Sequence, residues 1–189
     1  MKWMTEGFRG FSLLALLACY CISSGCGGNY PPGVHPTERG AKYIFKDRII
    51  FDDGDTIAYG GEYIRFLGVD TPEVIDSSLG FFENQPYGPE ASESTKTWIR
   101  RAELVEYLPD GKDVYGRRLA HILVDGELLG VRLVRCGLAY ETVTQYGDSG
   151  FPKQAKQILD AARDAPTPRF QKPYNWRKKQ RKNLERSGK

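Results

Sequence analysis

The alternation of hydrophobic and polar positions predicts strands in the first part of the body of this chain. Three runs rich in β-branched and aromatic residues lie at 43–51, 56–60 and 62–69, separated by Asp-Gly and Gly-Gly pairs. Such pairs favour tight turns between antiparallel strands, so the three runs predict a meander. Residues 74–86, which follow, show no regular period and predict a loop.

The spacing then changes to that of a helix. Pro89 suits the first turn of a helix, and the residues after it place small or apolar side chains on one face. The side chains that recur at this spacing are Ala91, Thr95, Trp98 and Ala102. We therefore expect a helix that begins near Pro89.

The second half of the body predicts two more strands and two more helices. Hydrophobic runs at 104–108 and 117–124 predict strands joined by a turn-rich segment. A short helix within 128–139 is expected to end at Gly137. An amphipathic helix over 152–164 is expected to end before two nearby prolines.

This order of elements predicts an α+β fold, a five-stranded OB-type β-barrel with about three flanking helices. We expect a lipoprotein-type signal peptide at 1–25, a flexible tether at 26–40, a folded domain at 41–165 and a basic tail at 166–189. The tail is polar and basic and is expected to be mobile, although Trp176 and Tyr174 offer side chains that can dock on the domain.

The N-terminal residues predict export. Lys2 and Arg9 precede an uncharged run at 11–22, which is too short to span a bilayer comfortably. The small residues before Cys26 resemble the lipobox of bacterial lipoproteins, in which the cysteine carries the lipid; Cys19 is a second candidate. The prediction is an extracytoplasmic protein held on a membrane by lipid at Cys26, with secretion as the alternative.

Charge is distributed unevenly along the chain. The net charge is +3, but residues 166–189 carry nine Lys or Arg against one acid, so residues 26–165 carry −6. A protein that only wraps nucleic acid would have a basic body, whereas an acidic body suits carboxylates gathered around a cation. The tail is expected either to contact phosphates in a salt-sensitive way or simply to be solvated.

The cysteines and histidines of the body do not suggest a disulfide or a zinc site. Cys136 is the single cysteine after residue 26, and His35 and His121 lack the spacing of zinc ligands. We expect Cys136 to be a small buried hydrophobe and His121 to be a packing residue.

Three polar clusters carry the chemistry. Each has an ordinary structural explanation by itself: 53–56 fits a tight turn, 65–73 fits a strand end with a helix cap, and 113–118 fits a turn that leads into a strand. Together they supply hard oxygen ligands for Ca²⁺ and two arginine forks for phosphate oxygens. A further carboxylate can take a proton from water, so the set suits phosphodiester hydrolysis.

The same segments resemble the staphylococcal nuclease family. They are FDDGDT (51–56), IRFLGVDTPE (64–73), YGPEAS (87–92) and DVYGRRLA (113–120), and VRCGLA (134–139) is similar to that family's helix after the barrel. Their order and spacing match the family over about residues 42–165. The resemblance implies a Ca²⁺-dependent nuclease that cleaves DNA and RNA with little sequence preference and leaves 3′-phosphate ends.

The resemblance also implies a role for each site residue. Asp55 and Asp70, with the Thr71 carbonyl, would hold Ca²⁺, and Glu73 would orient or deprotonate the attacking water. Two arginines, Arg65 and Arg117, would neutralise charge on the phosphate, and Arg117 would assist the leaving 5′ oxygen. Asp53 would lie beside the metal ligands, and Tyr115 would line the nucleotide site. No obligate protein partner is inferred.

Two other functions fit the predicted fold less well. Nuclease-like domains that serve only in binding are expected to lack one of the catalytic residues, but Arg65, Asp70, Glu73 and Arg117 are all present. An OB module for single-stranded nucleic acid should have a basic groove with aromatic side chains, which the acidic body argues against.

Overall fold

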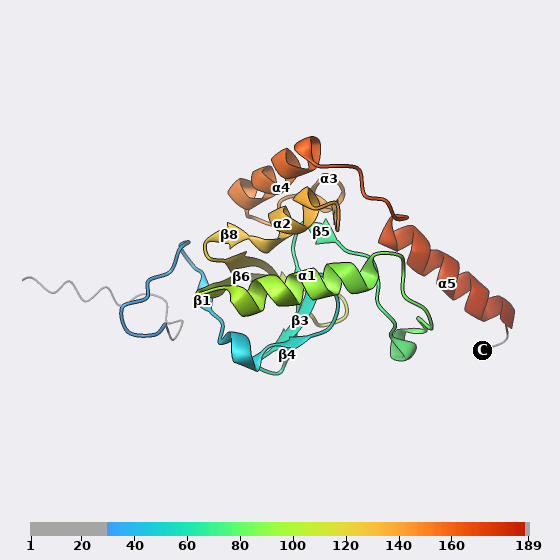
Figure 1. Ribbon diagram of the computed structural model, residues 1–189, viewed down its shortest axis with the longest axis horizontal. Helices are drawn as coiled ribbons and strands as arrows, with labels where there is room; N and C mark the ends of the chain where they lie inside the picture. Colours follow the sequence, from blue (N-terminus) through green and yellow to red (C-terminus); the bar gives the residue numbers. More distant parts are fainter. Residues whose placement is uncertain (1–29, 188–189) are drawn as a thin grey trace, which may run out of the picture.

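The computed structural model describes residues 30–187 and contains a curled sheet covered by helices (Figure 1). The strands are β1 (Lys42–Tyr43), β2 (Ile50–Phe51), β3 (Thr56–Tyr59), β4 (Glu62–Phe66), β5 (Val69–Asp70), β6 (Val105–Lys112), β7 (Arg118–Val124), β8 (Glu127–Leu128) and β9 (Tyr140–Glu141). The helices are α1 (Gly88–Arg101), α2 (Leu129–Arg135), α3 (Val143–Tyr146), α4 (Pro152–Asp164) and α5 (Pro173–Ser187), with 3₁₀ turns η1 (Lys46–Arg48) and η2 (Ser77–Leu79).

The main sheet has the strand order β1-β6-β7-β4-β3-β2, with β8 added on β7. The predicted meander is present in β3 and β4, where Gly60 (φ 61°) and Gly61 (φ 83°) form the turn with the two positive φ angles that such hairpins need. β4 then runs parallel to β7, with Arg65 opposite Leu119. This pairing joins the two halves of a curled half-barrel of the OB type, and the protein is α+β as predicted.

The barrel differs from the prediction in its number of strands. The run at 43–51 is not one strand, because η1 separates β1 from β2. These two short strands lie at opposite ends of the sheet order, β1 on β6 and β2 on β3. The bend at η1 carries the chain from one edge of the sheet to the other, so seven strands, several of two residues, form the sheet.

The hydrophobic core lies between the sheet and helices α1, α2 and α4. Side chains that are almost completely buried come from every layer, including Ile57, Ile64, Ile99, Leu129, Leu133 and Ile158. Among the described residues there are five α-helices instead of about three. The two additions are the single turn α3 and the tail helix α5.

Residues 30–40 contain no helix or strand, but they pack on the sheet. The buried carboxylate of Glu106 accepts a hydrogen bond from the Tyr30 hydroxyl at 2.6 Å and from the Thr37 backbone N–H at 3.0 Å. The Thr37 hydroxyl also contacts Glu106. This part of the expected tether therefore lies against β6, while residues 26–29 and the expected signal peptide fall outside the described residues.

The tail expected to be mobile instead forms the helix α5 over residues 173–187, and this helix docks on the domain. Trp176 is buried and its ring lies 5.2 Å from that of Phe81, while Tyr174 is exposed. Gln180 donates a hydrogen bond to Glu83 at 2.7 Å, so α5 lies along the 74–86 loop (Figure 1, red beside green). Within residues 30–187, no helix has the length and apolar character that crossing a membrane requires.

His121 in β7 makes the stability of the fold depend on pH. It is 4% exposed, packs edge-on against Phe151, and its Nε2 has no hydrogen-bond partner within the described part of the chain. Burial lowers the pKa of His121 from 6.5 to about 4, and Asp110 opposes this shift only in part. The unfolded chain therefore binds a proton between these two pH values while the folded chain does not, so acid favours unfolding.

We expect the free energy of unfolding to fall by about 2 kcal/mol between pH 7.5 and pH 5 because of His121. Urea unfolding at the two pH values measures the fall, and His121→Leu should remove this part of it. His35→Gln, at an exposed histidine, is the control and should keep it. An unchanged pH dependence in His121→Leu contradicts the assignment.

Candidate active site

Asp55 is the centre of the polar cluster at the start of β3. Its side chain is completely buried, and its backbone N–H donates to Asp53 Oδ1 at 2.9 Å, which shapes the turn. The Asp55 carboxylate accepts hydrogen bonds from the Thr71 backbone N–H at 2.6 Å and the Thr56 hydroxyl at 3.3 Å. One aspartate thus connects the first hairpin with the segment that follows β5.

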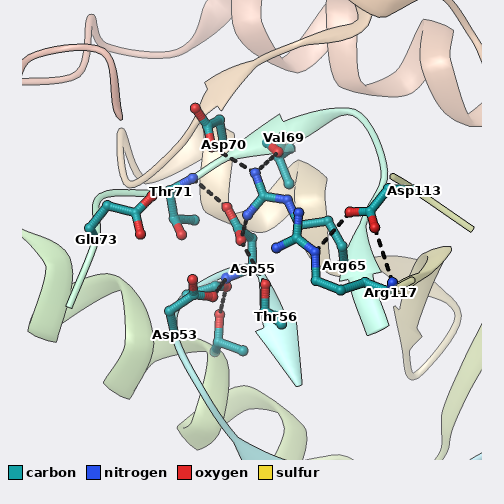
Figure 2. Close-up of polar contacts among 12 residues, drawn as sticks. Asp53, Asp55, Thr56, Arg65, Val69, Asp70, Thr71, Glu73, Asp113 and Arg117 are labelled. Atoms are coloured by element: carbon teal, nitrogen blue, oxygen red, sulfur yellow. Dashed lines mark hydrogen bonds and ion pairs between the residues drawn. The ribbon is translucent and has the colours of Figure 1, made fainter. Parts of the chain in front are cut away.

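Arg65 joins this aspartate to the next one. It lies on β4 opposite Thr56, and its guanidinium forms ion pairs with both Asp55 and Asp70, the second at 2.6 Å. It also donates to the Val69 carbonyl at 3.2 Å. Figure 2 shows the Arg65 side chain beside Asp55, with Asp70 above them. The arginine that interrupts an apolar strand therefore faces two buried carboxylates.

Glu73 lies three residues after Asp70 and is also buried. Its backbone is fixed by Gln85, which accepts from the Glu73 N–H at 3.2 Å and whose own N–H donates to the Glu73 carbonyl at 2.9 Å. Burial raises the pKa of the Glu73 carboxyl, an effect that Arg177 opposes and Asp53 reinforces. A carboxyl with a raised pKa is better suited to accept a proton from water.

Two glycines allow the segments of the site to approach one another. A Cβ on Gly54 would lie 2.7 Å from the Thr71 hydroxyl and 2.9 Å from Ala91 in α1. A Cβ on Gly88, at the start of α1, would lie 2.1 Å from the Glu73 carbonyl oxygen. The Tyr87–Ser92 segment therefore packs against the backbone of Glu73 through Gly88.

Gly88→Ala is expected to lower the free energy of unfolding by about 2 kcal/mol and to displace Glu73, although alanine favours helices. The contact is with backbone atoms, which cannot move aside cheaply. Gly111→Ala is the matched control, because a Cβ there meets nothing within 4 Å. Denaturant unfolding of both variants measures the difference, and equal stabilities would contradict this account.

Arg117 lies on the rim of the site, at the end of a turn built on Asp113. The Asp113 carboxylate accepts from the backbone N–H groups of Tyr115 (2.9 Å) and Arg117 (3.0 Å) and from Arg117 Nε (2.8 Å). The Arg117 guanidinium lies 5.7 Å from the centre of the Tyr115 ring, and Tyr115 is 81% exposed. The turn thus presents an arginine and an aromatic ring together.

Both Arg65 and Arg117 influence the pKa of the Asp53 carboxyl. Burial raises the pKa of Asp53, and Arg65, hydrogen bonds from Thr56 and then Arg117 oppose the rise. In Figure 2, Glu73 and Arg117 lie on opposite sides of Asp55 and Arg65. The structure therefore gathers the predicted residues of all three sequence clusters into one region.

The centre of this region is rich in the oxygen atoms that hard cations such as Ca²⁺ prefer. Asp55, Asp70 and Glu73 are buried carboxylates, and the buried Thr71 hydroxyl has no hydrogen-bond partner within residues 30–187. Over the same residues, no group of three or more acidic, His or Cys side chains is already arranged around a metal position. Guanidinium groups lie between the carboxylates instead.

One of these guanidinium groups was not predicted. Arg177 of α5 forms ion pairs with Asp70, at 3.2 Å, and with Glu73. The sequence contains a weak signal for it, because Trp176, Gln180 and Leu184 recur every fourth residue, as on one helix face. The many charged residues between them hide this stripe.

The structure tests the prediction for Cys136 but not the one for Cys26. Cys136 is exposed at the end of α2, so the prediction of a buried hydrophobe is wrong; the buried face of that helix is filled by residues such as Leu133 and Val134. Cys26, like Cys19, lies outside the described residues, and its lipidation stays a prediction.

The family model of the staphylococcal nuclease homologues matches residues 63–171, which is more than half of the chain. The matched part includes Arg65, Asp70, Glu73 and Arg117. This chain belongs to the staphylococcal nuclease family. A thermonuclease of Staphylococcus intermedius is 36% identical over 145 residues, covering 74% of this chain and 81% of that relative.

Two further relatives of this nuclease come from Bacillus subtilis (strain 168). Endonuclease YncB is 40% identical over 113 residues, 54% of this chain and 51% of the relative. The SPbeta prophage-derived endonuclease YokF is 38% identical over 107 residues, 51% of this chain and 35% of the relative. The chain thus spans about half or less of these two relatives, and the family assigns it to the nuclease class of hydrolases.

Proposed function

We propose that this nuclease depends on Ca²⁺, cleaves both DNA and RNA with little sequence preference and leaves 3′-phosphate ends. The observation that carries the proposal is the buried carboxylate cluster of Asp55, Asp70 and Glu73, flanked by Arg65 and Arg117. Burying several carboxylates is unfavourable unless positive charge compensates them, and this need for positive charge supports cation binding at the cluster.

In this proposal Asp55, Asp70 and the Thr71 carbonyl hold the cation, and Asp53 supports them from the turn. Bound Ca²⁺ supplies positive charge next to the phosphate and a place for water. Glu73 orients that water or takes its proton. The raised pKa that burial confers on Glu73 supports this role.

The two arginines are proposed to grip the phosphate from different directions. Arg65 is in contact with Asp55 and Asp70. When it exchanges these partners for phosphate oxygens, it neutralises the negative charge that develops on the phosphate during the reaction. The Arg117 side chain is 33% exposed, and within residues 30–187 its ion pair is with Asp113 alone. Its guanidinium can therefore reach the leaving oxygen. Tyr115 lies beside it for contact with the nucleotide.

A digestion assay tests this function. The chain is incubated with single-stranded DNA, duplex DNA and RNA in Ca²⁺, and the ends of the products are analysed for phosphate. We expect cleavage of all three substrates and 3′-phosphate ends. Products with 5′-phosphate ends, or cleavage of one class of substrate alone, would contradict the proposal.

The proposed location is the outer side of a membrane, with lipid attached to Cys26 and secretion as the alternative. A non-specific nuclease is safer outside the cytoplasm, where calcium is also abundant. Several acyl chains on one cysteine would hold the protein more firmly than a single chain can.

Labelled palmitate is expected to enter the wild-type protein and not Cys26→Ser, which should instead leave the membrane fraction. Cys19→Ser is the control and should keep the label. Label that persists in Cys26→Ser and disappears in Cys19→Ser would move the anchor to Cys19. Absence of label from the wild type would leave secretion as the explanation.

A further inference from the structure

The α5 helix brings a positive charge into the proposed cation site. Arg177 Nη1 and Nη2 each donate to one oxygen of Asp70 at 3.2 Å, and Nη1 also contacts Glu73 Oε1. Both oxygens of Asp70 and one of Glu73 are therefore in contact with this one guanidinium. These are carboxylates that the proposed function assigns to the metal and to the water.

The contact is part of a docked segment and not of a loose surface side chain. The chain before α5 is held by the Tyr140 hydroxyl, which donates to the Phe170 carbonyl at 2.8 Å, and by Gln85, which donates to the Gln171 carbonyl at 2.6 Å. Trp176, next to Arg177, is 6% exposed. Gln85 also fixes the backbone of Glu73, so the tail and the site share a partner.

The electrostatics favour a charged Arg177 at this position. Burial by itself lowers the pKa of Arg177, but Asp70 and Glu73 outweigh it and raise that pKa above the ordinary value. The Arg177 side chain is 26% exposed, and those of Asp70 and Glu73 are 10% exposed. An ion pair this sheltered is screened less than one on the open surface.

A divalent cation and Arg177 cannot use the same oxygens in the same geometry. Calcium ligands lie at about 2.3–2.6 Å, and a guanidinium that contacts both oxygens of Asp70 fills that space. Binding of the cation therefore requires Arg177 to move.

We propose that α5 is an intramolecular inhibitor, in which Arg177 holds Asp70, a proposed cation ligand, together with Glu73 until Ca²⁺ displaces it. The proposal rests on the proposed Ca²⁺ site. α5 lies beyond residue 171, where the match to the family model ends. This helix thus adds a control over metal binding to a domain whose catalytic residues lie within or before the matched part.

The direction of the change in Ca²⁺ affinity separates this inhibitor from a merely structural ion pair. If Arg177 competes with the cation, Arg177→Ala strengthens Ca²⁺ binding, whereas if Arg177 only supports the site, the same change weakens it. Because breaking a sheltered pair costs more than breaking an exposed one, we expect Ca²⁺ to bind roughly ten-fold more tightly or better to Arg177→Ala.

Isothermal titration of the metal-free full chain with CaCl₂ measures this affinity without any substrate. Arg177→Gln is the second variant, which keeps polar contacts and protects the test if Arg177→Ala folds poorly. Lys178→Ala is the matched control, because it removes one positive charge from an exposed position of the same helix. Its Ca²⁺ affinity should equal that of the wild type.

Hydrogen exchange of residues 173–187 gives a second readout that needs no variant. Ca²⁺ should speed exchange in α5 of the wild type, because displacement of Arg177 loosens the docked helix. Equal or weaker Ca²⁺ binding by both Arg177 variants, or exchange in α5 that Ca²⁺ leaves unchanged, overturns the inhibitor. Failure of every form, including Arg177→Ala, to bind Ca²⁺ instead overturns the proposed metal site and the inhibitor with it.

Discussion

Arg117→Ala is expected to lower kcat by about 10²–10³-fold while the protein stays folded, because groups aimed at developing charge are commonly worth about 3–4 kcal/mol. Arg117 is the cleanest residue for this test. Its described ion pair is with Asp113 on the rim, so removing it strands no fully buried carboxylate. Initial rates at saturating DNA measure the loss of kcat.

The neighbouring arginine provides the matched control. Arg118, the next residue in the chain, begins β7 and pairs with Glu62 at 3.3 Å and not with a carboxylate of the site. Arg118→Ala should therefore leave kcat nearly unchanged. Arg117→Lys should restore little of the lost rate, because lysine keeps the charge but lacks the planar fork. Near-normal turnover by a folded Arg117→Ala enzyme would show that the site is misplaced.

Losses of similar size are expected for Arg65→Ala and Glu73→Gln, but their interpretation differs. Arg65→Ala removes the partner of two buried aspartates, so a lower stability accompanies the lower kcat. Glu73→Gln keeps the shape of the side chain and removes its capacity to take a proton. Comparing Glu73→Gln with Arg117→Ala therefore separates the loss of the base from the loss of charge stabilisation.

Chelation of Ca²⁺ is expected to abolish cleavage, and Mg²⁺ is expected to restore little of it. The smaller ion demands near-octahedral geometry at short distances and gives up water reluctantly. Here the proposed ligands are few and come from separate segments, Asp55 just before β3, Asp70 in β5 and Thr71 directly after it. Such a site adapts more easily to the longer, variable distances of Ca²⁺.

Rates of DNA digestion in chelator, in Ca²⁺ and in Mg²⁺ measure this dependence. Circular dichroism in chelator is the control, because the protein should stay folded when the guanidinium groups of Arg65 and Arg177 compensate the carboxylates. Full activity in chelator, or equal rates with the two metals, would contradict the Ca²⁺ assignment.

The sequence by itself determined the family, the fold class and the residues of the three polar clusters that meet in the candidate site, but not Arg177. Local patterns carried this information, because the turn at Asp53–Asp55, the strand that bears Arg65 and the Asp113 turn are each encoded within a few residues. Motif order then related these pieces to a known arrangement, in which they meet.

The number of strands could not be predicted from the local hydrophobic pattern. A run such as 43–51 has the hydrophobicity of one strand, and its division into β1 and β2 depends on the two edges of a curled sheet that the run connects. The same holds for Glu106, whose buried carboxylate is satisfied by Tyr30 and Thr37, 76 and 69 residues away.

Only the tertiary structure decided what the basic tail does. By composition, residues 173–187 are a solvated, highly charged segment, and helix propensity alone does not stabilise so short a helix in water. Packing of Trp176 on Phe81 supplies the missing stabilisation, and the ion pairs of Arg177 with Asp70 and Glu73 add to it. Since these partners lie about a hundred residues earlier in the chain, the spacing of Trp176, Gln180 and Leu184 indicates a helix face but not that the helix enters the site.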